Sequence, residues 1–338
     1  MRIGILTGGG DCPGLNPAIR GAVYRAFDYG DEVIGFEEGW KGLMEDIKRP
    51  LTLKDVEEII GEGGTILFTS RTNPFKLESG PEKVVETLKK NNIDALIAIG
   101  GDDTLSVALE LHKMGIKVVG VPKTMDNDLS ETDYTFGFFT SVEVAVDALN
   151  RLRDTAKSHK RIIVLEVMGR EAGWVALYTG IAGGADWILI PEEKPDYDKM
   201  CEHLKKKYEE KGYALVVVSE GIETPSENKG EVDAFGHALL QKKGVHEYVA
   251  DLISEKLGIS TRSAIIGHIQ RGGSPVVFDR ILATRVGVKA VDMVHQGDFG
   301  KMAAIAGNNV LAVPLEDAVG KTKLVNEEWV KFMEIFKK

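Results

Sequence analysis

Residues 95–114 read ALIAIGGDDTLSVALELHKM, and this stretch determines the expected class of fold. It begins with the short apolar run Ala95–Ile99, which does not alternate with polar residues and is therefore typical of a strand buried on both faces of a parallel sheet. Two glycines follow, and a helical pattern then covers Leu105–Met114. Such a strand–turn–helix unit is the repeating element of α/β proteins.

Similar units recur along the whole chain of 338 residues. The other apolar runs that we expect to form buried strands are Ile3–Leu6, Val118–Val121, Ile162–Val167, Trp187–Ile190, Leu215–Val218 and Ala264–Ile266. The other helical patterns cover Pro17–Tyr29, Ser141–Thr155, Lys199–Lys211, Val245–Leu257 and Arg280–His295. Because a single hydrophobic core stops growing at roughly 250–300 residues, we expect an α/β protein of two lobes, each with a mainly parallel sheet flanked by helices.

Composition excludes several classes of partner. The net charge of −10 argues against nucleic acid and anionic membranes as partners, and no apolar run approaches the ~20 residues of a membrane span.

The run Ile3–Leu6 follows the N-terminus at once, so no signal peptide is expected. Two cysteines, Cys12 and Cys201, make no disulfide framework. A cytoplasmic location is therefore expected.

Glycine-rich and acidic sequences follow the predicted strands, where α/β folds bind their ligands. Gly8-Gly9-Gly10 can bring backbone N–H groups close to a phosphate, or it is a tight turn without a ligand. Asp102 and Asp103 suggest a Mg²⁺ site, or a solvated loop that caps a helix. Asp126-Asn127-Asp128 offers a base for a hydroxyl group, or an Asx-rich turn. Asp11 follows the three glycines. With it, three strand ends in one half of the chain bear carboxylates, which favours a catalytic or metal-binding role over simple turns.

Five arginines lie in loops or at strand ends, and guanidinium groups grip phosphate in a bidentate way. For any one of them alone, a surface salt bridge is the better interpretation. The sequence around Arg271 is more specific, because His268, two glycines and a Ser-Pro turn surround it. Cys12 has no histidine near it in sequence, so a small packed thiol is expected rather than a nucleophile. The five arginines are Arg71, Arg161, Arg170, Arg262 and Arg271.

Six segments, taken in order, resemble the motifs of the phosphofructokinases. The resemblance runs from Arg2 to about His295 and implies the fold of that family. The segments are Thr7–Asn16, Gly100–Asp102, Pro122–Asp128, Met168–Arg170, Ser219–Gly221 and Gly267–Ser274.

The resemblance also implies roles for single residues. Gly10 would bind the donor phosphates, Asp102 would hold Mg²⁺, Asp126 would accept the proton of the sugar 1-hydroxyl, and Arg71 would bridge the transferred phosphate. Residues matching Arg161 and Arg262 reach across from a neighbouring subunit in this family, which implies a homodimer or homotetramer with shared active sites. The implied substrate-binding residues of the same chain are Thr124, Met125, Asp126, Asp128, Met168, Gly169, Arg170, Glu220, His268, Ile269, Gln270 and Arg271.

Two positions bear on the phosphoryl donor. Relatives that use ATP usually have glycine at the positions of Asp103 and Lys123, and the Asp/Lys pair resembles the pyrophosphate-dependent branch of the family. A carboxylate at position 103 would repel the α-phosphate of a nucleotide by about 1 kcal/mol at ~4 Å even in bulk water. Lys123 would stabilise negative charge on the transferring phosphoryl group.

The sequence therefore predicts reversible phosphoryl transfer from pyrophosphate to the 1-hydroxyl of fructose 6-phosphate, giving fructose 1,6-bisphosphate and phosphate, as in glycolysis and gluconeogenesis. The alternatives are an ATP-dependent 6-phosphofructokinase and, from another class, a sugar-binding sensor without catalysis. The three aspartates Asp102, Asp126 and Asp128 disfavour the sensor. The expected donor lobe, for pyrophosphate and Mg²⁺, comprises residues 1–138 and about 251–305, and the sugar-phosphate lobe comprises 139–250 and about 306–338.

Overall fold

The computed structural model describes residues 1–224 and 244–337. The chain divides into two compact units. The first unit comprises Met1–Met125, Leu129–Thr140 and Arg271–Lys321, and the second comprises Asp126–Asp128, Ser141–Gln270 and Thr322–Lys338. The chain therefore passes between the units several times.

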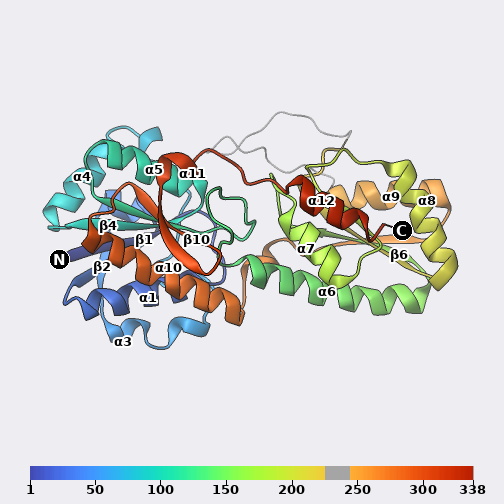
Figure 1. Cartoon of the computed structure of the whole chain (residues 1–338), viewed down its shortest axis with the longest axis horizontal. Helices are drawn as coiled ribbons and strands as arrows, with labels where there is room; N and C mark the ends of the chain where they lie inside the picture. Colours follow the sequence, from blue (N-terminus) through green and yellow to red (C-terminus); the bar gives the residue numbers. More distant parts are fainter. Residues whose placement is uncertain (225–243, 338) are drawn as a thin grey trace. The chain divides into compact units, whose positions relative to one another are not determined.

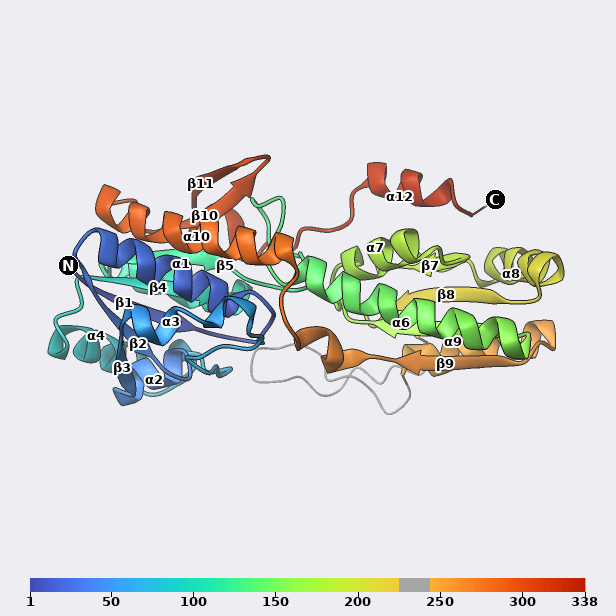
Figure 2. The same cartoon turned by 90° about the horizontal axis from the view of Figure 1, so that it is seen from below.

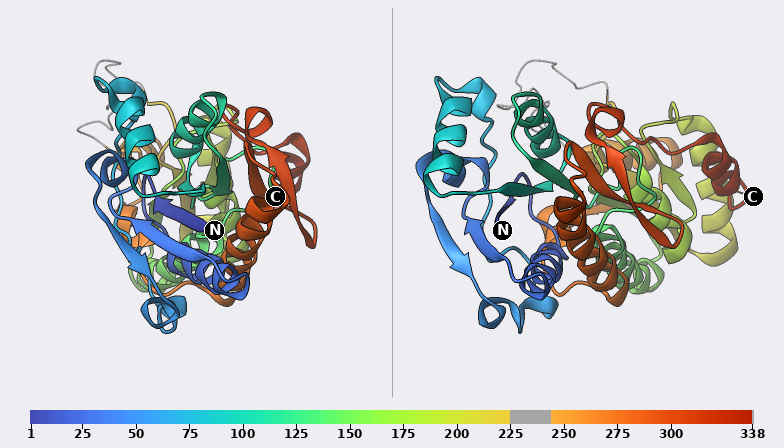
Figure 3. Two further views of the ribbon diagram at one scale, coloured as in Figure 1. Left: turned by 90° about the vertical axis from the view of Figure 1, so that its left-hand side faces the viewer. Right: turned by 60° about the vertical axis from the view of Figure 1, so that its left-hand side comes forward.

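A seven-stranded sheet forms the centre of the first unit, in the order β11-β10-β5-β4-β1-β2-β3. The five central strands are parallel, whereas β3 pairs antiparallel with β2 at one edge and β11 pairs antiparallel with β10 at the other (Figure 3). The strands are β1 (Arg2–Thr7), β2 (Glu32–Phe36), β3 (Lys48–Leu51), β4 (Ala95–Gly100), β5 (Val118–Pro122), β10 (Lys301–Ala306) and β11 (Asn309–Pro314).

Helices cover both faces of this sheet (Figure 1). On one face, α2 (Trp40–Glu45), α4 (Gly80–Lys90), α5 (Asp102–Lys113) and α11 (Leu315–Ala318) share a core with every second strand residue, such as Leu96 and Ala98. On the other face, α1 (Leu15–Asp28) packs against α10 (Val277–Gln296), and α3 (Leu53–Val56) lies beside α1. A Cβ at Gly287 would clash with the Ala18 carbonyl, so this glycine permits the close packing of α1 and α10. Two 3-10 turns, η1 (Ile59–Gly61) and η2 (Pro74–Lys76), complete the unit.

The second unit contains a parallel four-stranded sheet in the order β7-β8-β6-β9 (Figure 2). Val164, Trp187 and Leu189 share a core with α8 and α9 on one face. Ile188 points to the other face and packs against Gly180 of α7, and Trp329 of α12 contacts Trp174 of α7. The elements are α6 (Phe138–His159), β6 (Ile162–Val167), α7 (Trp174–Gly183), β7 (Trp187–Leu189), α8 (Tyr197–Lys211), β8 (Ala214–Ser219), α9 (Val245–Leu257), β9 (Thr261–Ile265), η3 (Gly267–Arg271) and α12 (Glu327–Glu334).

The predicted fold class is confirmed, and each predicted strand and helix is present to within a few residues. The sequence patterns did not predict β2, β3, β10 or β11, nor the helices α2, α3, α4, α7, α11 and α12. The later segment of the first unit is Arg271–Lys321, which differs from the predicted 251–305 at both ends. The reason is topological, since β9 joins the second sheet whereas β10 and β11 join the first. None of the helices in the described ranges combines the length and apolar character needed to cross a membrane.

Candidate active site

A glycine-rich loop, Gly8–Asp11, follows β1 in the first unit. Backbone hydrogen bonds anchor it, because Gly8 N donates to Ile99 O at 2.9 Å and Gly9 N donates to Ser70 O at 3.1 Å. Arg71 comes directly after Ser70, and its side chain is exposed. The structure therefore places Arg71 beside the glycine-rich loop, on a segment far from it in sequence.

Thr104 explains why two of the glycines near this loop cannot carry a side chain. It is 3% exposed, and a Cβ at Gly8 would lie 2.7 Å from its Oγ1. A Cβ at Gly100 would clash with the Thr104 side chain as well. Thr104 thus packs between the ends of β1 and β4. The sequence patterns alone do not single out Thr104, although it follows Gly100 by four residues.

Asp102 and Asp103 form the first turn of α5, where the helix dipole stabilises negative charge. The Asp102 side chain is exposed and accepts a hydrogen bond from Gly320 N at 2.7 Å, while Asp103 is half-buried. Within the described ranges, no three His, Cys, Asp or Glu side chains gather closely enough to hold a metal ion between them. A single exposed carboxylate still fits Mg²⁺, which takes one or two carboxylates and completes its shell with water and phosphate oxygens.

Two cations flank the glycine-rich loop. Lys123 is 3% exposed; its backbone N donates to Gly100 O at 2.9 Å, and its Nζ donates to the carbonyl of Gly10. Arg271 donates from Nη1 to Asp11 O at 3.1 Å, and a Cβ at Gly10 would lie 2.5 Å from that nitrogen. Arg271, expected among the sugar-phosphate residues, therefore lies against the loop expected to bind the donor.

The loop that contains Asp126 leaves the first unit after Met125, which is almost fully buried. Thr124 O accepts a hydrogen bond from Thr135 Oγ1 at 2.6 Å. Asn127 adopts a left-handed backbone conformation with φ of 55°, and it separates the half-buried Asp126 and Asp128. The loop is thus a tight turn that carries two carboxylates.

Three adjacent parallel strands of the second unit, β6, β8 and β9, end along one edge of the sheet. Met168, Gly169 and Arg170 follow β6, and Glu220 follows β8 with its backbone N donating to Val167 O at 3.0 Å. Ser219 Oγ donates to the carbonyl of Gly169. The structure therefore brings these two predicted sugar-phosphate segments together.

The segment after β9 contributes to the same edge in two different ways. His268 and Ile269 in η3 have exposed side chains. Gln270, by contrast, is fully buried; its Oε1 accepts from Met168 N at 2.8 Å and its Nε2 donates to Ser141 Oγ at 2.9 Å. Gln270 therefore supports the Met168 backbone from inside the protein.

Arg161 and Arg262 lie at the opposite end of these strands. Arg161 precedes β6, and Arg262 is the second residue of β9, paired in register with Ile163. At about 3.3 Å per residue, the seven steps from Arg161 to Met168 span roughly 23 Å. Neither arginine joins the Met168–Arg170 edge of its own chain.

Cys12 is a packed thiol, as expected. It is fully buried, its Sγ donates to Phe136 O at 3.4 Å, and burial raises the pKa of the thiol to about 12. A thiol that stays protonated at neutral pH is a poor nucleophile.

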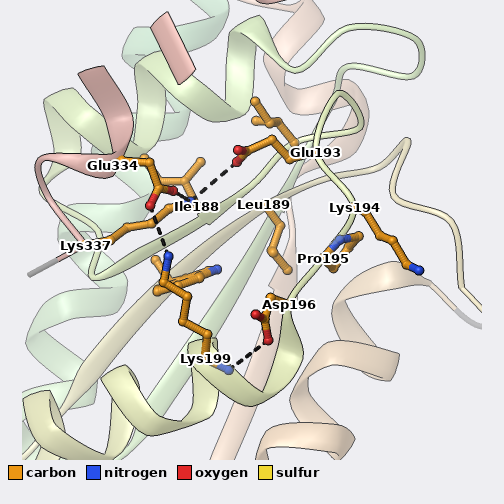
Figure 4. Close-up of a pocket in the computed structure, with 11 residues that line it drawn as sticks. Ile188, Leu189, Glu193, Lys194, Pro195, Asp196, Lys199, Glu334 and Lys337 are labelled. Carbon is orange, nitrogen blue, oxygen red and sulfur yellow. Dashed lines mark hydrogen bonds and ion pairs between the residues drawn. The ribbon is translucent and has the colours of Figure 1, made fainter. Parts of the chain in front are cut away.

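A cavity of about 190 Å³ lies along the outer edge of β7 in the second unit (Figure 4). Ion pairs line it, since Lys337 pairs with Glu193 at 3.5 Å and Lys199 pairs with Glu334 at 3.2 Å. The residues that line it include none of those predicted to bind substrate or metal. The candidate active site is therefore not this cavity.

Comparison with known proteins gives a consistent result. The family model for phosphofructokinase matches residues 2–294. A pyrophosphate–fructose 6-phosphate 1-phosphotransferase of Dictyoglomus thermophilum is 54% identical over 99% of this chain and 98% of its own. One of the same name from Amycolatopsis methanolica is 50% identical over 99% of both chains. A Streptomyces coelicolor protein named ATP-dependent 6-phosphofructokinase 2 is 48% identical over 97% of both chains.

Solved structures match over nearly the whole chain. Phosphofructokinase from Pichia pastoris in the T-state superposes with a TM-score of 0.83 at 31% identity over 99% of this chain, which spans only 36% of that longer protein. A pyrophosphate-dependent phosphofructokinase from Nitrosospira multiformis superposes with a TM-score of 0.85 over 96% of this chain and 86% of its own. At 22% identity, the second match shows a common fold. By its sequence and its fold, the chain belongs to the phosphofructokinase family.

Proposed function

We propose that this phosphofructokinase transfers a phosphoryl group reversibly between pyrophosphate and the 1-hydroxyl of fructose 6-phosphate, with fructose 1,6-bisphosphate and phosphate as products. Two nearly full-length relatives that bear this activity in their names support the proposal. The feature that carries the choice of donor is the pair Asp103 and Lys123. Lys123 is bonded to Gly10 of the glycine-rich loop, and Asp103 lies in the first turn of α5, next to Thr104, which packs against Gly8.

Charge explains how this pair selects pyrophosphate. A nucleotide donor needs space for its α-phosphate, and the Asp103 carboxylate fills that space. The carboxylate also repels the negatively charged α-phosphate, by about 1 kcal/mol at 4 Å in bulk water and more in a cleft. Pyrophosphate ends one phosphate earlier and avoids this repulsion. Lys123 and Arg271 then supply positive charge at the Gly8–Asp11 loop for a small, highly charged donor.

In the proposed chemical step, residues of the strand-end loops act on the sugar hydroxyl and on the transferring phosphoryl group. Asp126 accepts the proton of the 1-hydroxyl, the oxygen–phosphorus bond forms, and the bond from phosphorus to the departing phosphate breaks. Lys123 and Arg71 stabilise the charge on the transferring group. Asp102 would hold Mg²⁺, which supplies further neutralisation of phosphate charge when bound. In the reverse direction, protonated Asp126 returns the proton to the sugar oxygen.

We assign donor binding to the first unit and most of sugar-phosphate binding to the second. Arg161 and Arg262 act in this proposal on the site of a neighbouring copy, which is supported by their position at the amino ends of β6 and β9. The proposed assembly is a homodimer or homotetramer. Two free, buried cysteines support a cytoplasmic enzyme. The sugar-phosphate residues are Thr124, Met125, Asp128, Met168, Gly169, Arg170, Glu220, His268, Ile269, Gln270 (through Met168) and Arg271, which also serves the donor loop in this proposal.

An ATP-dependent 6-phosphofructokinase is the second candidate, because a relative with that name is 48% identical, close to the identity of the pyrophosphate-dependent relatives. Overall identity therefore does not separate the two donors, and the proposed choice of pyrophosphate rests mainly on Asp103, with Lys123 in support.

Parallel assays of the purified protein test the donor. Fructose 6-phosphate and Mg²⁺ are supplied with either pyrophosphate or ATP, and the reverse reaction is started from fructose 1,6-bisphosphate and phosphate. We expect turnover with pyrophosphate in both directions and little with ATP. Robust turnover with ATP and none with pyrophosphate would overturn the proposal.

Mixed oligomers test the shared site. Asp126→Ser lacks the base but retains both arginines, whereas Arg161→Ala retains the base. If the arginine serves a neighbouring copy, co-expression of the two inactive variants restores complete sites and part of the activity. Absence of recovery in oligomers shown to contain both chains would contradict shared sites.

A further inference from the structure

The tail segment, Gly320–Lys323, connects α11 to α12, and its first two residues belong to the first unit. Gly320 N donates to Asp102 Oδ1 at 2.7 Å. Lys321 O accepts a hydrogen bond from Ser130 Oγ at 2.8 Å. This end of the segment therefore holds the carboxylate proposed to bind Mg²⁺.

The other end of the tail segment holds the turn that carries Asp126 and Asp128. Lys323 N donates to Asp128 O at 2.7 Å, and Lys323 Nζ donates to Asn127 Oδ1 at 3.1 Å. Trp174 fixes the lysine in turn, because Trp174 Nε1 donates to Lys323 O at 2.7 Å and the ammonium group lies 5.8 Å from the indole ring. The Lys323 side chain is therefore directed at the turn by contacts at both of its ends.

The backbone conformation of Asn127 explains why the hydrogen bond from Lys323 matters. The left-handed conformation costs most residues about 1–2 kcal/mol, and asparagine adopts it more easily because its side chain can form local hydrogen bonds. Asn127 has φ of 55° and is 2% exposed, so its side-chain amide must find partners inside the protein. A change in its backbone angles would reorient the adjoining residues Asp126 and Asp128.

We infer that Lys323 is a positioning residue for phosphoryl transfer, which holds Asn127 in its left-handed conformation and thereby fixes the directions of Asp126 and Asp128. This inference rests on the proposed roles of those two aspartates. It does not depend on which donor is used, because Asp126 and Asp128 are proposed to act on the sugar.

The test compares three variants with the wild-type enzyme, using whichever donor supports turnover. Lys323→Met keeps the length of the side chain and the backbone hydrogen bonds but removes the ammonium group. A misplacement of about 1 Å costs on the order of 100-fold in rate, so we expect kcat to fall about 10- to 100-fold. The KM for fructose 6-phosphate should rise, and the KM for the donor should stay within twofold of wild type. Lys323→Arg, which retains a donor, should recover a large part of kcat.

Lys321→Met is the matched control, because Lys321 belongs to the same segment and its side chain is exposed. Its kinetic constants should equal those of wild type. Binding of fructose 6-phosphate without donor, measured by calorimetry, should be weaker in Lys323→Met and normal in Lys321→Met. Wild-type kcat in Lys323→Met would overturn the inference, as would an equal rise of both KM values together with a lowered Tm, which indicates general destabilisation. Failure of the proposed function is distinguishable, since it would appear as lack of turnover in the wild-type protein.

Discussion

The ammonium group of Lys123 donates a hydrogen bond to the carbonyl oxygen of Gly10, which joins the end of β5 to the glycine-rich loop after β1. Lys123 is almost completely buried, and its backbone N donates to Gly100 at the end of β4. One residue thus connects three strand ends of the first unit. A buried cation in this position shapes the loop, and in the proposed function it supplies charge to an anionic donor.

Lys123→Met should lower kcat with pyrophosphate by about 100-fold, because the charge that stabilises the transferring phosphoryl group is lost. The volume of the side chain is conserved, so the fold should be retained. Steady-state rates at saturating pyrophosphate measure the effect. Lys117→Met, at an exposed position before β5, should behave as wild type. Near-normal turnover of Lys123→Met would remove the lysine from the chemical step.

Asp103→Gly should weaken the use of pyrophosphate and admit ATP. Glycine leaves space for the α-phosphate of a nucleotide and removes the negative charge that repels it. The ratio of kcat/KM for the two donors is the measurement. Glycine also lowers helix stability by about 1 kcal/mol, so Glu110→Gly on the exposed side of the same helix serves as control. A donor ratio that is unchanged in Asp103→Gly would contradict the proposed mechanism of selection.

Asp126→Ser should reduce kcat by about 10²–10⁴-fold, the usual contribution of a positioned general base. Binding of fructose 6-phosphate and the Tm should change little, since the side chain is half-buried and lies in a loop. Calorimetry and thermal unfolding check those two expectations. Asp154→Ser, on an exposed turn of α6, is the control. If Asp126→Ser retains substantial turnover, another group is the base.

Asp279 should make stability depend on pH. It is fully buried in α10, where Oδ2 accepts from Thr140 N at 2.8 Å and from Thr140 Oγ1 at 2.6 Å. Burial raises its pKa from the ordinary 3.8 to about 6, because the charged form loses hydration. The folded state therefore keeps the proton that the unfolded state releases. The resulting stabilisation, about 3 kcal/mol at most, is complete below pH 4 and is lost as the pH rises towards 6.

Asp279→Asn removes this titration, so its Tm relative to wild type should rise between pH 4 and pH 7. If the new amide lowers the Tm by the same amount at every pH, that change does not affect the trend with pH. The exposed substitution Asp154→Asn should show no such trend. A difference in Tm that stays the same across this range would mean that Asp279 does not titrate there.

Local patterns explain why much of the fold was predictable. Ile162–Val167 and Val245–Leu257 were predicted with the boundaries that they have in the structure, because an apolar run and a helical period are properties of neighbouring residues. The strand β10 was missed, since its small residues become a strand only by pairing with β5 and β11. The helix α7 is apolar on most sides and shows no amphipathic period.

The sequence by itself determined the order of strand-end motifs, the acidic and glycine-rich chemistry at those ends, and the family. Only the tertiary structure decided which of these residues meet. It placed Arg271 against Gly10 and Asp11, buried Gln270 beneath Met168, and connected Lys323 with Asn127 across 196 positions of sequence. The physical reason is that secondary structure follows from local backbone and side-chain preferences, whereas these contacts depend on which strands pair and which chain segments return to the same unit.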